Sequence, residues 1–147
     1  MEAQTNPTGA LQELAAFVND GKLGYEKAAQ ETMNEAHRTV YRGLSAQRAA
    51  FVEDLNRLIR EHGGEKERSQ VIQGELYRQW VDTKTSTGGD DETLVLANVQ
   101  LEEWTLKAYD QVLGNGALAA PARQRVEEQR QAIEKSLSQL QEMRLSA

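Results

Sequence analysis

The chain has 147 residues, a formal net charge of -6 and no cysteine. Its length suits one domain with a buried core, and 39% hydrophobic with 27% charged residues is typical of a folded protein. The lack of cysteine excludes disulfides and thiolate metal sites, and the acidic balance argues against nucleic acid as a partner.

No apolar run approaches the roughly 20 residues that cross a bilayer, and the first ten residues lack the basic and then apolar pattern of a secretion signal. We therefore expect a cytoplasmic protein that does not enter a membrane.

Two periodic segments come first in the chain. Apolar or small residues recur every three or four positions over 7–32, and a second such stripe runs over 35–62, after the good N-cap Asn34. Gly21 and Gly24 lie inside the first segment, which indicates either close approach of a neighbouring backbone or a local kink. Because almost nothing separates the two segments, they are predicted to be antiparallel neighbours.

Three further segments keep a helical period. They cover 68–84, 91–113 and 119–145, with Pro121 in the first turn of the last one. Four long helices with one long connection, here holding a short extra helix, are the arrangement of ferritin-like proteins. The sequence thus predicts an all-α, ferritin-like four-helix bundle that forms a single domain over 1–147.

The segment 91–113 carries two apolar rows, offset by one residue and so by about 100° around the helix. One helix face cannot bury both rows, so the second needs a cover of its own. The cover is either the extra helix, with its Trp80, or a second subunit in a homodimer. The residues of a possible interface are therefore Trp80, Leu101 and Trp104.

Several segments resemble the DUF2383 family over nearly the whole chain. The matching stretches are Asp20 with Gly24-Tyr25 and Ala28-Ala29, LNRLIREHGG from 55 to 64, GELYRQW from 74 to 80, and LEEWTLKAY from 101 to 109. The resemblance implies a ferritin-like bundle in a bacterium, associated at most with stress. Two departures stand out: Tyr77-Arg78 replaces a His-Arg pair, and Leu137 stands where many members have histidine.

Two carboxylates fall on predicted core stripes. Asp54 follows Leu44, Gln47 and Phe51, and Glu102 follows Val95 and Val99. A buried charge is costly unless it is paired.

Three explanations remain open for these two carboxylates. They form a buried salt-bridge network with Arg130, or they bind manganese or iron, or a one-residue error in the stripes places them in solvent. The candidates for an all-carboxylate metal site are Asp20, Asp54, Glu102, Glu127 and Glu128.

The two histidines do not complete a ferritin-type di-iron motif. That site needs Glu-x-x-His, yet Asn34 precedes His37 by three residues and Ile59 precedes His62. No catalytic residue, cofactor or catalytic signature is predicted. We expect a non-catalytic structural or interaction protein; the alternatives are a carboxylate metal-binding protein, and a carrier of a small apolar ligand if the interior glycines open a cavity.

Overall fold

The computed structural model describes residues 7–63, 91–116 and 118–146. It contains four long helices, and these described residues include no strand. The helices are α1 (Pro7–Glu31), α2 (Glu35–Glu61), α4 (Asp91–Leu113) and α5 (Ala120–Ser146). The predicted all-α four-helix bundle is confirmed. The predicted extra helix over 68–84, with Trp80, lies outside the described residues.

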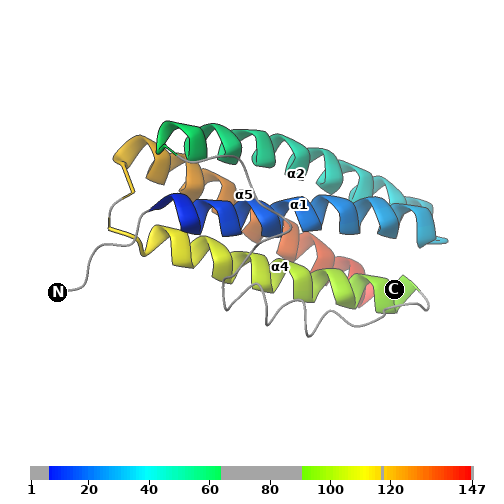
Figure 1. The fold of residues 1–147 in the computed structure, drawn as a ribbon. Coiled ribbons are helices and arrows are strands. Elements are labelled where there is room, and N and C mark those ends of the chain that lie inside the picture. Colours follow the sequence, from blue (N-terminus) through cyan, green and yellow to red (C-terminus); the bar gives the residue numbers. More distant parts are fainter. Residues whose placement is uncertain (1–6, 64–90, 117, 147) are drawn as a thin grey trace.

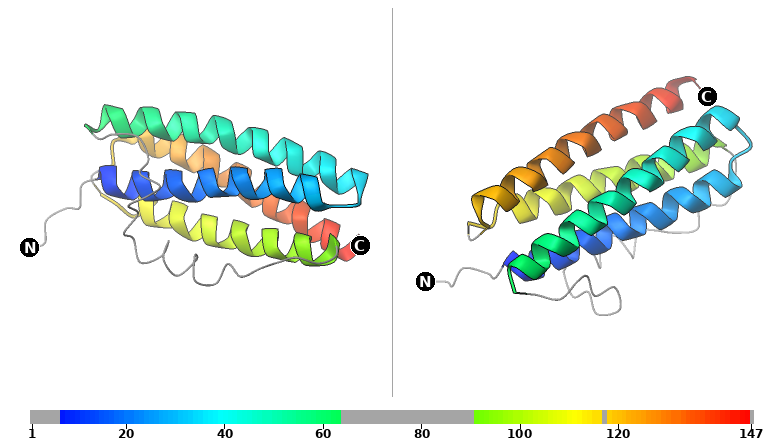
Figure 2. Two further views of the ribbon diagram at one scale, coloured as in Figure 1. Left: turned by 45° about the vertical axis from the view of Figure 1, so that its right-hand side comes forward. Right: turned by 90° about the horizontal axis from the view of Figure 1, so that it is seen from above.

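The bundle consists of two antiparallel helix pairs that pack side by side. α1 pairs with α2 and α4 with α5, and the two pairs meet mainly through α1 and α4 (Figure 1). α2 and α4 run in the same direction, so α2 ends and α4 begins at opposite ends of the bundle (Figure 2). This direction agrees with a long connection between them. No helix in the described part of the chain is long and apolar enough to span a membrane.

One residue at each end of α2 fixes where the helix begins and ends, and the predicted N-cap Asn34 is confirmed. The Asn34 side chain accepts a hydrogen bond from the backbone N–H of His37 at 3.0 Å, as an N-cap residue does. Gly63 ends the helix with φ +86°, a conformation that favours glycine. The Thr32 hydroxyl donates to Asp91 at 2.7 Å, which ties the turn between α1 and α2 to the start of α4.

The apolar core is divided into two clusters along the bundle. The larger cluster includes Leu11, Leu14, Phe17, Val52, Leu55, Ile59, Ala108, Tyr109, Val126 and Ile133. The smaller cluster includes Tyr25, Ala28, Tyr41, Leu44, Val95, Val99, Leu140 and Met143. On α2, residue 48 lies between Leu44 of the smaller cluster and Val52 of the larger. Polar residues occupy this intermediate level.

Within the described residues, one member of the second apolar row of α4 lies against α1. A Cβ atom added to Gly24 would lie 3.7 Å from Cδ2 of Leu101, and one added to Gly21 would lie 3.9 Å from it. Leu101 is therefore covered by the glycines of α1, and its predicted place in an interface is wrong. Trp104 is half-buried against the larger cluster, with the Lys107 ammonium 4.5 Å from its ring centroid.

Candidate functional site

The centre of the bundle holds a buried ion pair between α2 and α4. Nη1 of Arg48 donates to Oε1 of Glu102 at 2.8 Å, and Nη2 donates to Oε2 at 2.6 Å. Both side chains are 0% exposed. This two-bond geometry matches the planar guanidinium to the planar carboxylate and uses both carboxylate oxygens.

The surroundings of Arg48 accommodate a guanidinium in the core. A Cβ atom on Gly21 of α1 would lie 3.6 Å from Nη1, in ordinary van der Waals contact, so a side chain longer than that of alanine would reach the guanidinium. The Tyr25 ring faces the guanidinium at 5.3 Å from its centroid, a cation-π distance. Nε of Arg48 donates to Oε1 of Gln47 at 3.0 Å, so each nitrogen of the guanidinium group has a hydrogen-bond acceptor.

Arg48 keeps its charge in the core, and the tyrosines around it stay neutral. Burial alone would lower the pKa of Arg48, but the adjacent Glu102 carboxylate raises it above its ordinary range. Burial also raises the pKa of Tyr25 well above the usual value, and Glu102 raises it further. Burial likewise raises the pKa of Tyr109. The guanidinium of Arg48 is thus the cation of this layer, and Tyr25 and Tyr109 add no charge to it.

Hydrogen bonds extend this layer to the other helices. The Tyr109 hydroxyl donates to Oε1 of Gln129 on α5 at 2.7 Å, and Nε2 of Gln129 donates to the Phe51 carbonyl on α2 at 3.4 Å. Ser136 lies two helical turns beyond Gln129, and Glu102 lies two turns before Tyr109. Since α4 and α5 are antiparallel, Ser136 stands at the level of Glu102, where its hydroxyl donates to the Ala132 carbonyl. α5 therefore brings a small neutral side chain to the level of the ion pair.

A group of aromatic residues adjoins the ion pair on the side of the smaller cluster. The Tyr25 and Tyr41 rings stack with centroids 6.1 Å apart, and His37 meets Tyr41 edge-on at 6.3 Å. Both hydroxyl oxygens and Nδ1 of His37 are buried without a hydrogen-bond partner in the described part of the chain. Buried polar atoms of this kind usually bind ordered water.

The predicted network of Asp54, Glu102 and Arg130 is not formed. Asp54 keeps a quarter of its side chain exposed and pairs with Arg57 at 2.9 Å and with Arg125 at 3.6 Å. Arg130 lies at the surface, where it pairs with Asp110 and Glu134. Of the two predicted core carboxylates, Glu102 is buried and Asp54 is not, and the partner of Glu102 is Arg48 and not the predicted Arg130.

Arg48 was missed because the stripe assigned to α2 was displaced by one residue. Gln47, Phe51 and Asp54 are half-buried, whereas the row Tyr41, Arg48 and Leu55 is fully buried. The spacing of seven residues in this buried row was a usable signal. An arginine within it looked like a solvated residue, since arginine is almost never fully buried unless it is paired.

The carboxylates proposed as metal ligands do not come together. Within 7–63, 91–116 and 118–146 there is no group of three or more histidine, aspartate or glutamate side chains that could hold a metal ion. Glu127 and Glu128 are exposed on α5, and Asp20 is half-buried on α1. Arg48 already engages both Glu102 oxygens, so the residues at this level do not fit the di-iron centre of ferritins.

One comparison with known proteins gives a match. The model of the family described as "Domain of unknown function (DUF2383)" matches residues 6–115, which covers α1, α2 and α4. No curated protein and no solved structure matches the chain. The matched region includes both members of the buried ion pair.

Proposed function

Because the chain belongs to the DUF2383 family, whose description assigns no activity, we propose from its geometry that it is a non-catalytic helical bundle that acts as a structural or interaction protein. The observation that supports this function is the complete burial of the ion pair between Arg48 and Glu102. A catalytic or metal-binding carboxylate needs a free lone pair within reach of its substrate or ion. Glu102 is out of reach of a substrate or ion from solvent, since neither side chain of the pair is exposed, and each of its oxygens already accepts a hydrogen bond from Arg48.

The ion pair has the properties of an element that specifies packing. Removal of one partner from a buried pair leaves the other charge unpaired and typically costs about 3 to 5 kcal/mol. Alternative registers of α2 against α4 would separate Arg48 from Glu102, so they would meet this cost. The pair thereby favours one arrangement of the helices. Because the pair lies in the core, the outer faces of the helices are free to contact other molecules.

Metal binding by three purified proteins tests the non-catalytic part of this function. Fe²⁺ and Mn²⁺ are titrated into the wild type, Arg48→Met and Glu102→Gln, with helicity followed by circular dichroism. We expect well under one equivalent of metal and no ferroxidase activity in the wild type. Stoichiometric binding by the wild type that is lost in a folded Glu102→Gln variant would favour the metal-binding alternative.

Three further features belong to the same proposed function. The resemblance of the sequence to the DUF2383 family implies a ferritin-like bacterial protein associated with stress, and the common direction of α2 and α4 supports a ferritin-like topology. A cytoplasmic location is supported by the sequence pattern. Homodimerisation is tested by light scattering on the full chain, because a dimer doubles the monomer mass at micromolar concentration.

A further inference from the structure

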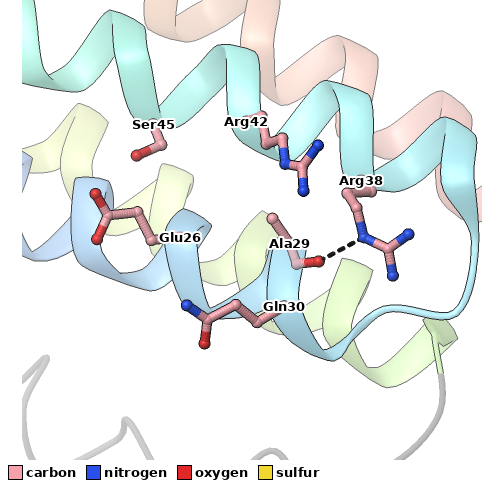
Figure 3. Close-up of a pocket in the computed structure, with 6 residues that line it drawn as sticks. All are labelled: Glu26, Ala29, Gln30, Arg38, Arg42 and Ser45. Atoms are coloured by element: carbon pink, nitrogen blue, oxygen red, sulfur yellow. Dashed lines mark hydrogen bonds between the residues drawn. The ribbon is translucent and has the colours of Figure 1, made fainter.

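A solvent-facing hollow lies between α1 and α2, beside the turn that joins them. It has a volume of about 530 Å³, which is within the size range of small-molecule sites. Its lining residues are Glu26, Ala29 and Gln30 from α1 and Arg38, Arg42 and Ser45 from α2 (Figure 3). Ala29 contributes only a methyl group to this lining.

Hydrogen bonds between α1 and α2 hold both ends of the hollow in place. At one end Nε of Arg38 donates to the Ala29 carbonyl at 2.8 Å and Nη2 donates to the Thr32 carbonyl at 2.5 Å. The remaining guanidinium nitrogen pairs with Glu35. At the other end the Ser45 hydroxyl donates to the Lys22 carbonyl at 3.2 Å. Arg38 is thus committed to the end of α1, and the walls of the hollow are preorganised.

Two charged side chains of the hollow remain available. Arg42 and Glu26 are exposed, and neither forms an ion pair or hydrogen bond with another described residue. Arg42 also stands one turn after Arg38, and like charges at this spacing repel each other. An anion beside Arg42 would therefore relieve repulsion as well as form a charge-assisted hydrogen bond.

The positions of the charges limit the kind of ligand. Figure 3 shows Glu26 and Ser45 toward one end of the hollow and Arg38 toward the other, with Arg42 and Ala29 between them. A ligand that is only anionic, such as phosphate, would meet the Glu26 carboxylate. We infer that this hollow binds a small zwitterion, whose carboxylate contacts Arg42 and whose ammonium group contacts Glu26. The exposed Gln30 amide can contribute neutral hydrogen bonds to the same ligand.

Nuclear magnetic resonance titrations of the full chain test this site. Glycine, γ-aminobutyrate and ε-aminocaproate carry the same two charged groups at increasing separation, and acetate and butylammonium each carry one. We expect saturable shifts of backbone amides around the hollow with one of the zwitterions, in the millimolar range, and weaker effects with either single charge. The separation that binds best measures the span between Arg42 and Glu26.

Substitutions of Arg42 and Glu26 test the contacts of these residues with the carboxylate and the ammonium group of the ligand. Arg42→Gln and Glu26→Gln should each weaken binding of the best zwitterion by about fivefold, as expected for a partly solvated ion pair of about 1 kcal/mol. The matched controls are Arg60→Gln and Glu53→Gln, exposed residues of α2 outside the hollow, which should leave binding unchanged.

Two results would overturn this site. One is the absence of saturable shifts with all three zwitterions. The other is equal binding of acetate and the zwitterions with no effect of Glu26→Gln, which would indicate a carboxylate site without an ammonium contact. Neither result bears on the non-catalytic function, because Arg48 and Glu102 lie outside this hollow.

Discussion

The molecule contains two arginine–carboxylate groups whose N–O distances are similar and whose surroundings differ. Arg48 and Glu102 are completely buried, whereas Arg130 pairs with Asp110 and Glu134 at the surface with distances of 2.7 Å. Short distances therefore do not distinguish the two groups. Solvent does, since water screens the surface charges and can replace their partners, while a buried charge has no such replacement.

The largest expected effect comes from breaking the buried pair. Arg48→Met or Glu102→Leu alone should lower the free energy of unfolding by about 3 to 5 kcal/mol, because each leaves an unpaired charge in the core. The double variant should recover most of this loss, since an apolar pair of similar volume avoids that charge. Urea denaturation of the four proteins measures the cycle, and additive losses would contradict a direct interaction between the two side chains.

The buried aromatic group beside the ion pair should also respond to alkaline pH. Burial raises the pKa of Tyr41 from its usual value near 10 to about 12. Ionisation of Tyr41 therefore opposes folding. Tyr41 leaves stability unchanged below pH 10, and stability falls progressively as pH rises from 10 to 12.

Over this pH range the free energy of unfolding should fall by roughly 3 kcal/mol because of Tyr41. Urea denaturation at several pH values should show stability falling above pH 10, and Tyr41→Phe should reduce the slope. An identical slope in that variant would show that Tyr41 is not the source.

A smaller loss is expected from a neutral bond beside the ion pair. Tyr109→Phe removes the hydroxyl that donates to Gln129 and leaves a buried amide oxygen without this donor. Its cost should be about 1 to 3 kcal/mol, which is below that of a stranded charge. Thermal unfolding compared with the Arg48→Met variant tests this order. A Tyr109→Phe variant as stable as the wild type would mean that water replaces the lost donor.

The surface network should contribute less. Arg130→Gln should change stability by about 1 kcal/mol or less, and the change should shrink further at high salt. Denaturation at low and high ionic strength measures both quantities. A salt-independent loss as large as that of Arg48→Met would contradict the contrast between the two groups.

The smallest expected effect concerns the space that Gly21 leaves for Arg48. A Cβ atom there would be in ordinary van der Waals contact at 3.6 Å from Nη1, so Gly21→Ala should be accommodated. Because alanine favours helix by about 1 kcal/mol over glycine, the net change should lie between zero and that gain. A larger side chain, as in Gly21→Leu, serves as the control and should displace the guanidinium and destabilise the fold.

Local sequence features were sufficient to predict the helices. Asn34 caps α2 through its own side chain, and Gly63 ends it through a conformation that depends on one residue. The period of the apolar residues gave the range 91–113, which matches α4. These features depend on residues within a turn or two of each other, so no tertiary contact was needed to find them.

The sequence by itself also placed Glu102 on a core stripe with Val95, Val99 and Tyr109, and the structure buries it there. It did not determine the partner. A one-residue shift turns a helix face by about 100°, and this was enough to exchange Arg48 for Gln47 on the stripe of α2.

Only the tertiary structure decided that Arg48, 54 positions from Glu102 in the chain, stands at the same level of the bundle. The same packing places Arg130 at the surface and places Leu101 against Gly21 and Gly24. The physical reason is that helix periodicity depends on neighbours in sequence. The choice of a partner depends on how far each helix is rotated and shifted against the next.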